Sequence, residues 1–173
     1  MKKLFNDGFS FLLMKTGSTY DEFMACAQKT VPVSIPHDWV IDDAHNFYTD
    51  GCGCYIKNFE YEMHDKARVF LRFDGVYMDS RIYLNDTLVG EWKYGYTSFV
   101  LDITEHLKTG ENTLVAIIDY RCPNSRWYSG AGIYRNVWLI ENENIFIPDN
   151  GIYVHSYPED NKLDGNWIIN YRN

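Results

Sequence analysis

The stretch VFLRFDGVYMDSRIYLNDTLVGEW, residues 69–92, decides the fold class. Apolar residues occupy every second position from Val69 to Phe73, so they lie on one side of an extended chain. The second part has the form of a β-hairpin, because Asn85-Asp86 supplies turn residues between two apolar runs. The stretch therefore predicts consecutive antiparallel strands.

The same signals continue on both sides of this stretch. SFVLDI at 98–103 alternates again, and NTLVAIIDY at 112–120 is nearly continuously apolar, as a central strand of a sandwich is. NVWLIE at 136–141 adds a further strand. Turn signals recur about every 8 to 14 residues, which favours an all-β sandwich over a fold of alternating strands and helices.

Helix signals are sparse. STYDEFMACAQ at 18–28 predicts a short helix, with Ser18 or Thr19 as its N-cap and acidic residues in the first turn. DITEHLKTGEN at 102–112 predicts a single helical turn between two strands, ended by Gly110.

Composition limits the classes of partner. The chain has 173 residues and a formal net charge of −8, and no basic cluster interrupts this charge, so nucleic acid is not expected as a partner. The apolar run Phe9–Met14 is too short for the core of a signal peptide, and no stretch approaches the roughly 20 apolar residues that span a bilayer. We therefore expect no membrane partner and a soluble, cytoplasmic protein.

The four cysteines do not form a metal motif. Cys52 and Cys54 are spaced as C-x-C rather than as the C-x-x-C pairs of a zinc ribbon, and no histidine lies at zinc-knuckle spacing. We expect reduced thiols that act as small apolar residues, and neither a metal nor a cofactor.

A domain boundary is expected near residues 142–150, where ENENIFIPDNG concentrates Asn, Glu, Pro and Gly. We assign 1–143 to the main sandwich and 144–173 to a linker and a further unit. IYVHSY and NWIINY in that unit look like two more strands. Either these strands dock onto the sandwich or they begin another domain, since two strands alone are marginally stable.

Five motifs along the chain carry a family resemblance: VSIPHDW (33–39), DGCGCYIKNF (50–59), LRFDGVYMDSRIYLND (71–86), GYTSFVLDIT (95–104) and RWYSGAGIYRNVWL (126–139). Together they resemble the N-terminal sugar-binding domain of glycoside hydrolase family 2, which includes β-galactosidases and β-glucuronidases. The resemblance covers nearly the whole chain to about residue 141. One departure is GCYIK at 53–57, where the family usually has Gly-Trp-Tyr-Arg-Lys.

The resemblance implies a jelly-roll β-sandwich at the front of a longer enzyme. In the family an immunoglobulin-like domain follows, and then a (β/α)8 barrel with two catalytic glutamates that perform retaining hydrolysis. Residues 144–173 resemble the first strands of that immunoglobulin-like domain. The chain itself is expected to be noncatalytic and inactive. The parent is expected to be a β-galactosidase that hydrolyses terminal β-galactosides, with a β-glucuronidase as the alternative. A homo-oligomeric parent stays open.

Sugar sites combine aromatic platforms with carboxylates, amides and guanidinium donors. RWYSG at 126–130 supplies such a set, with Arg126 as donor and Trp127 and Tyr128 as platforms. The resemblance implies that the loop preceding this motif touches the sugar, and that contacts also come from the loop before GCGCY and from IPHDW. The expected wall of the sugar pocket consists of Asp38, Asn46, Asp50, Asn124, Ser125 and Arg126.

Each of these residues also has a structural interpretation. Trp39, Trp127 and Tyr128 are assigned to the interface with the barrel or to stacking, because large aromatic residues dominate interfaces. Asp38 is either a sugar or interface contact or the acceptor of an Asx-type turn. His37 is interpreted as a structural histidine, and Arg135 as structural and paired with an acid in the core.

Two other functions stay open. A free-standing carbohydrate-binding module would bind sugar tighter than about millimolar without a barrel. A protein-interaction sandwich would have no sugar affinity and would expose an apolar patch where a partner docks.

Overall fold

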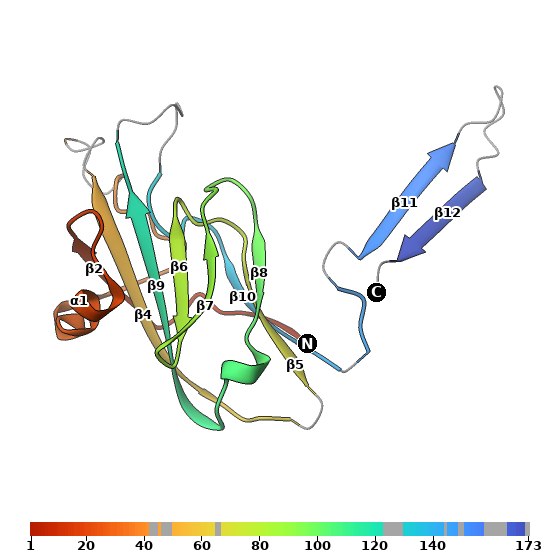
Figure 1. Cartoon of the computed structure of the whole chain (residues 1–173), viewed down its shortest axis with the longest axis horizontal. Coiled ribbons are helices and arrows are strands. Elements are labelled where there is room, and N and C mark those ends of the chain that lie inside the picture. The colour runs from red at the N-terminus through yellow and green to blue at the C-terminus, as the bar shows by residue number, and fades with distance from the viewer. Residues whose placement is uncertain are drawn as a thin grey trace. The chain divides into compact units, whose positions relative to one another are not determined.

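The computed structural model describes residues 1–41, 45, 50–64, 67–122, 130–143, 145–148, 151–157 and 166–171, and of these only the backbone for 155–157 and 166–171. The chain divides into two compact units, Met1–Asn142 and Glu143–Asn173. Figure 1 shows the elements of both units.

The first unit is an antiparallel β-sandwich, as the sequence predicts. One sheet has the order β3-β2-β4-β9-β6-β7 and the other the order β1-β10-β5-β8. The strands of the six-stranded sheet are β2 (Phe9–Met14), β3 (Val31–Val33), β4 (Gly51–Tyr61), β6 (Ser80–Leu84), β7 (Thr87–Trp92) and β9 (Gly110–Tyr120). Those of the four-stranded sheet are β1 (Lys2–Leu4), β5 (Arg68–Phe73), β8 (Phe99–Asp102) and β10 (Val137–Asn142).

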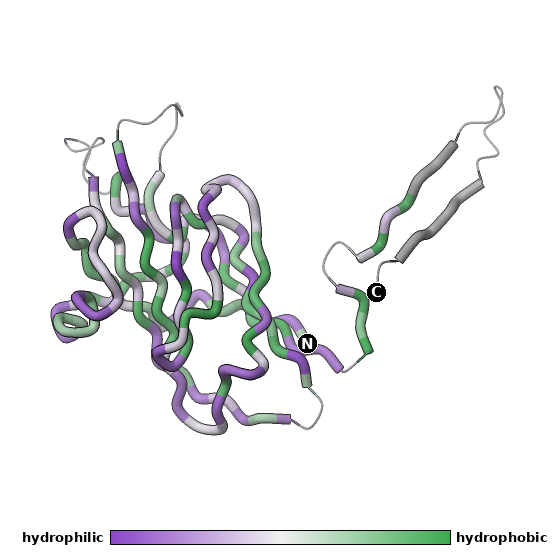
Figure 2. The backbone as a smooth tube through the Cα atoms, viewed as in Figure 1, coloured by the Kyte–Doolittle hydropathy of each residue, from purple (hydrophilic) through white to green (hydrophobic). Residues whose placement is uncertain are grey.

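Alternation along β5 places the core between the sheets. Val69, Leu71 and Phe73 are fully buried, whereas Phe70 and Arg72 between them are half-buried on the outer face. The predicted alternation is therefore confirmed. Figure 2 shows apolar residues along the central strands and polar residues in the connections, the distribution that burial of one sheet face produces.

The hairpin between β6 and β7 has the predicted turn. Leu84 and Thr87 are paired, and Asn85 and Asp86 between them have φ values of +49° and +67°. Asn and Asp tolerate this left-handed region better than most residues do, and two such residues form the turn that matches strand twist.

A short helix, α1 (Tyr20–Met24), covers part of the outer face of the six-stranded sheet. Thr19 is its N-cap: its side chain accepts a hydrogen bond from the Glu22 amide, and the Glu22 carboxylate accepts one from the Thr19 amide, which completes a capping box. A 3₁₀ turn, η1 (Ala27–Lys29), follows, and a second, η2 (Thr104–His106), lies between β8 and β9, where the sequence predicts a helical turn.

The helix explains why β4 and β9 are buried on both faces. Phe23 of α1 packs into a second apolar cluster with Cys52, Cys54, Val115 and Ile117. All four cysteines of the chain are free thiols. A hydrogen bond with Cys52, together with burial, raises the pKa of the Cys54 thiol, so this side chain acts as a small apolar residue.

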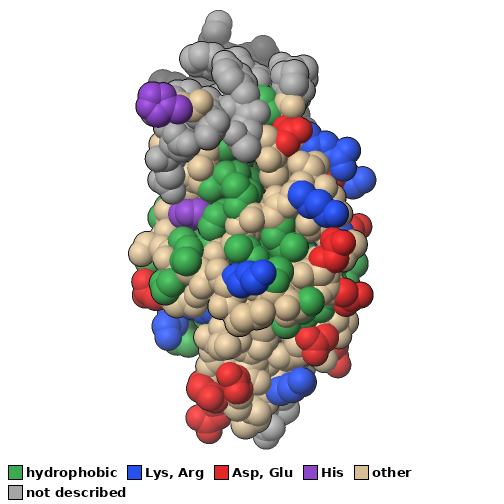
Figure 3. All heavy atoms as spheres, turned by 90° about the vertical axis from the view of Figure 1, so that its left-hand side faces the viewer, with side chains coloured by type: hydrophobic (Ala, Val, Ile, Leu, Met, Phe, Trp, Pro, Cys, Tyr) green, Lys and Arg blue, Asp and Glu red, His purple; other side chains and the backbone are tan. Residues whose placement is uncertain are grey.

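The surface over α1 and β2 mixes both signs of charge. Figure 3 shows acidic and basic side chains interspersed around apolar side chains in the middle of this face. Exposed apolar residues of this edge include Leu13 of β2 and Val31 of β3. None of the helices described here is long and apolar enough to cross a membrane.

The second unit contains an antiparallel pair of strands, β11 (Ile152–Tyr157) and β12 (Asn166–Tyr171). These are the two strands expected from IYVHSY and NWIINY. Their assignment to the start of an immunoglobulin-like domain stays a prediction.

Candidate functional site

Several predicted site segments meet at one end of the sandwich. At this end β4 begins and β9 ends, at the top of the sandwich in Figure 1. The backbone of His37 donates to Ile133, and that of Trp39 donates to Ala131, over 2.9 and 3.1 Å. Gly132 in turn forms a β-bridge with Tyr77. Three segments distant in the sequence are therefore held side by side.

Asp38 is the polar anchor of this arrangement. Its carboxylate is buried, and Oδ1 accepts hydrogen bonds from the amides of Val40, at 3.1 Å, and Ala131, at 2.9 Å. The bond to Val40, two residues on, is the Asx-type turn considered from the sequence. The bond to Ala131 ties the IPHDW segment to the glycine-rich motif. A contact between Asp38 and sugar stays a prediction.

Gly132 shows why the glycine-rich motif needs a residue without a side chain. Its φ is +125°, in the left-handed region, where a side chain is strained. A Cβ there would also lie 2.4 Å from the hydroxyl of Tyr55 and 2.6 Å from the carbonyl oxygen of His37. The motif therefore uses this glycine to bring its backbone against the core.

Trp39 packs inside the domain. Its ring stacks on Phe11 with centroids 5.5 Å apart and meets Tyr120 edge-on at 6.4 Å. A Cβ on Gly53 would lie 2.2 Å from the Trp39 ring, so Gly53 makes the room for it. Only 8% of Trp39 is exposed. Its predicted contact with a second domain stays a prediction, and little of the side chain is left to make one.

The side chain of His37 packs against residues of the same core. Its Nδ1 lies 2.7 Å from the hydroxyl of Tyr55, and its ring is tilted against Phe11 at 4.7 Å. These contacts agree with the structural interpretation of His37.

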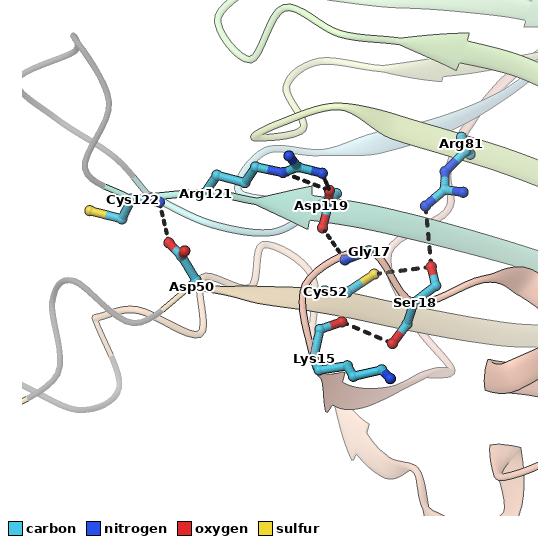
Figure 4. A network of polar contacts seen from close by, with 9 residues as sticks. All are labelled: Lys15, Gly17, Ser18, Asp50, Cys52, Arg81, Asp119, Arg121 and Cys122. Atoms are coloured by element: carbon cyan, nitrogen blue, oxygen red, sulfur yellow. Dashed lines mark hydrogen bonds and ion pairs between the residues drawn. The ribbon is translucent and has the colours of Figure 1, made fainter.

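Asp50 joins the two strands that border the site. Its Oδ1 accepts a hydrogen bond from the amide of Cys122, which links the residue before β4 to the end of β9 (Figure 4). Asp50 is exposed. Its predicted role as a sugar contact stays a prediction, and the bond to Cys122 gives it a positioning role.

Asp119 is a polar residue of this end that the sequence interpretation left unassigned. It is 6% exposed, and its Oδ1 accepts from the amide of Gly17 at 2.8 Å. Its Oδ2 accepts from both Nε and a terminal nitrogen of Arg121, at 3.1 and 3.0 Å (Figure 4). These hydrogen bonds and the charge of Asp119 raise the pKa of the exposed Arg121. In the sequence, Asp119 could have been found as the single acidic residue in the apolar run NTLVAIIDY.

The three aspartates at this end of the sandwich have the same structural role. Asp38, Asp50 and Asp119 each accept a hydrogen bond from the backbone of another segment. A carboxylate that accepts from backbone amides fixes the course of a loop. Within the described ranges, no group of three His, Cys, Asp or Glu side chains could hold a metal ion.

The remaining predicted site residues lie outside the described residues. These are Asn46, Asn124, Ser125, Arg126, Trp127 and Tyr128. Asp50 and Cys122 are the described residues that border the two loops containing them, 46–49 and 123–129.

The pairing of Arg135 with an acid in the core, considered from the sequence, is wrong. The sequence assigned it to an ion pair in the core, but its side chain is exposed. Its guanidinium carbon lies 5.3 Å from the ring centre of Tyr134. Its place at the entry of a strand indicated a structural role, but the chain turns this side chain outward before β10 (Val137–Asn142) begins.

Comparison with known proteins decides the family. The family described as "Glycosyl hydrolases family 2, sugar binding domain" matches residues 20–143. The chain belongs to this family. It is 38% identical to a β-galactosidase of Bacteroides ovatus over 75% of this chain and 17% of that protein. It is 33% identical to a β-glucuronidase of Bacteroides fragilis over 62% of this chain and 17% of that protein.

Solved structures agree with the fold of this family-2 domain. The crystal structure of a β-glycosidase from Bacteroides vulgatus matches with a TM-score of 0.81 and 29% identity, covering 100% of this chain and 24% of that one. The chain thus spans about a sixth of the two relatives and about a quarter of this structure. These proteins are named as a β-galactosidase, a β-glucuronidase and a β-glycosidase, which are all glycoside hydrolases.

Proposed function

We propose that this chain is the noncatalytic N-terminal domain of a longer β-galactosidase, in which it braces a catalytic barrel and forms one wall of the sugar pocket. The observation that carries the proposal is the family match over 20–143, in a chain that spans about a sixth of its relatives. Retaining hydrolysis by a pair of carboxylates would then take place outside this chain.

The hydrogen bonds at the end of the sandwich support the pocket-wall role. Asp38 and Asp50 accept hydrogen bonds from the backbone amides of Ala131 and Cys122, which lie close to either side of 123–129 in the sequence. Residues held by such hydrogen bonds give neighbouring side chains a defined backbone from which to make specific contacts. We propose that Asn124, Ser125 and Arg126 of this loop, with Asn46 of the neighbouring one, contact the sugar, and that Trp127 and Tyr128 pack against the barrel.

Two substrates are considered for the longer enzyme, a β-galactoside and a β-glucuronide. The β-galactosidase of Bacteroides ovatus has the higher identity to this chain, which favours a galactoside. The β-glucuronidase of Bacteroides fragilis keeps a glucuronide as the alternative.

Two polypeptides test the proposal: the 173-residue chain and the longer polypeptide from its natural reading frame. Both are assayed with p-nitrophenyl β-D-galactoside and p-nitrophenyl β-D-glucuronide, and product anomers are followed by NMR. We expect no hydrolysis by the chain alone, and hydrolysis of the galactoside by the longer polypeptide with retention of configuration.

Three results would contradict parts of this account. A natural stop after Asn173, or hydrolysis by the chain alone, would remove the accessory role. Preference of the longer polypeptide for the glucuronide would replace the substrate.

A further inference from the structure

A polar hollow of about 620 Å³ lies at the same end of the sandwich, on the side of the four-stranded sheet. Phe73 ends β5 there and is paired with Val137 at the start of β10 and Phe99 at the start of β8. The side chains that give the hollow its chemistry are those of Arg72, Asp74, Tyr96, Ser98, Tyr134 and Arg135.

The guanidinium of Arg135 lies at this hollow and is available to a ligand. Across the described parts of the chain it has a cation–π contact with Tyr134 and neither a hydrogen bond nor an ion pair. Its side chain nevertheless has a defined course, because a Cβ on Gly75 would lie 3.0 Å from Arg135 Cδ. The stem of Arg135 thus packs on the backbone of Gly75, and its charge lies at the hollow.

Tyr134 is fixed at both ends. Its hydroxyl donates to the carbonyl oxygen of Gly95 over 2.7 Å, and its ring end also packs on Gly75, where a Cβ would lie 2.8 Å away. A ring held in this way supports the guanidinium above it. Gly75 is therefore the small residue that allows Tyr134 and Arg135 to lie together.

Arg72 and Asp74 form a second polar group of the hollow. They are paired at 2.9 Å, and each side chain is about one-quarter exposed. The other oxygen of Asp74 accepts from Nε1 of Trp138 at 2.7 Å. Burial opposes the ionised form of Asp74, but these two donors outweigh it and lower its pKa. Asp74 neutralises the charge of Arg72, so Arg135 supplies the net positive charge of the hollow.

Tyr96 supplies an aromatic wall. It is half-buried, and its ring is held edge-on by Tyr77 at 5.3 Å and by Tyr94 at 5.8 Å. Exposed Ser98 lies two residues further on and adds a hydroxyl. An aromatic face beside hydroxyl and guanidinium donors suits the apolar face and polar rim of a sugar ring.

We propose that this hollow binds a sugar unit that carries a carboxylate, with the carboxylate on Arg135 and the face of the sugar ring on Tyr96. A planar guanidinium matches a carboxylate with two parallel hydrogen bonds. The site goes beyond the proposed function, because none of the residues that line it is assigned to the wall of the sugar pocket.

NMR titration of the ¹⁵N-labelled 173-residue chain tests the proposal. The probes are methyl β-D-glucuronide, methyl β-D-glucoside, which has a hydroxymethyl group instead of the carboxylate, and sodium acetate, which has the carboxylate without the sugar. We expect shift changes at Tyr96, Ser98 and 134–136 with the glucuronide. We expect binding of the glucoside and of acetate to be weaker by about tenfold, the loss for one charge-assisted pair or one stacked face.

Arg135→Gln is the main variant, because it removes the charge from an exposed side chain. We expect it to weaken glucuronide binding about tenfold. Arg68→Gln is the matched control, since Arg68 is also exposed and lies at the other end of β5. It should leave binding unchanged. Ser98→Glu keeps the other lining residues and should weaken binding by repulsion of the carboxylate.

Equal binding by Arg135→Gln and the unchanged chain would overturn the assignment of the carboxylate to Arg135. Equal binding of the glucoside would overturn the charge requirement, and equal binding of acetate would overturn the role of the sugar ring. Shift changes centred outside the hollow, or no binding at about 50 mM glucuronide, far above a millimolar Kd, would overturn the site itself. The proposed function would stand in each case, because the hydrolysis assay of the longer polypeptide is independent of this titration.

Discussion

Removal of the Asp38 carboxylate should destabilise the sandwich through two backbone amides. Oδ1 of this buried side chain accepts from Val40 and Ala131, so Asp38→Ala leaves two donors without an acceptor. Each unsatisfied buried donor costs about 1 to 3 kcal/mol. The backbone around these two amides can shift toward water, which reduces the cost. We therefore expect Asp38→Ala to lower the free energy of unfolding by about 2 to 4 kcal/mol, in the lower part of the range for two unsatisfied donors.

Asp38→Asn separates the hydrogen bonds from the charge. Its amide oxygen can still accept from both donors, so we expect a loss of about 1 kcal/mol, the share that belongs to the charge-assisted part. Asp7→Ala is the control, because Asp7 is an exposed carboxylate in the bend before β2. It should change stability by less than about 0.5 kcal/mol.

Urea unfolding at pH 7, followed by tryptophan fluorescence and circular dichroism, measures all three variants. A loss below about 0.5 kcal/mol for Asp38→Ala, within the range of ordinary surface substitutions, would refute the role of Asp38 as an anchor. Equal losses for Asp38→Ala and Asp38→Asn would show that charge, rather than the hydrogen bonds to the loops, is what matters.

Three further predictions concern other parts of the first unit. Gly132→Ala should cost about 3 kcal/mol or more, from left-handed strain and a clash with the Tyr55 hydroxyl, measured by thermal unfolding; an unchanged midpoint would contradict it. The lowered pKa of Asp74 gives stability that is present above about pH 4 and lost as pH falls through the folded-state value. Trp138→Phe removes one donor, so the fall in stability with acid should become shallower in urea titrations from pH 2.5 to 6, and an unchanged slope would count against it. Burial and the Glu141 carboxylate raise the pKa of Tyr61 to about 12, so Glu141→Gln should lower that pKa in an ultraviolet titration, whereas no change would rule out the Glu141 contact.

Local signals in the sequence account for much of the fold. Three features depend only on residues a few positions apart and are therefore predictable from the sequence: the alternation in β5, the Asn85-Asp86 turn and the Thr19 cap. The burial of β4 and β9 on both faces was harder to foresee, because it depends on α1 folding back over the sheet.

The site residues show the limit of this approach. The burial of Trp39 depends on Gly53 and on Phe11, which lie on neighbouring strands and are distant in sequence. The outward course of Arg135 depends on Gly75 in the same way. Family resemblance identified the segments that meet at this end, whereas the direction of each side chain follows from packing that sequence spacing does not encode.

The claim that this domain forms one wall of a sugar pocket is tested most directly by kcat/KM of the longer polypeptide for p-nitrophenyl β-D-galactoside. The variant is Asn124→Ala combined with Arg126→Ala, and Arg68→Ala is the control. We predict a loss of about tenfold or more for the double variant, the effect of removing one or two polar sugar contacts, with an unchanged midpoint of thermal unfolding. An unchanged kcat/KM in the double variant would contradict the account.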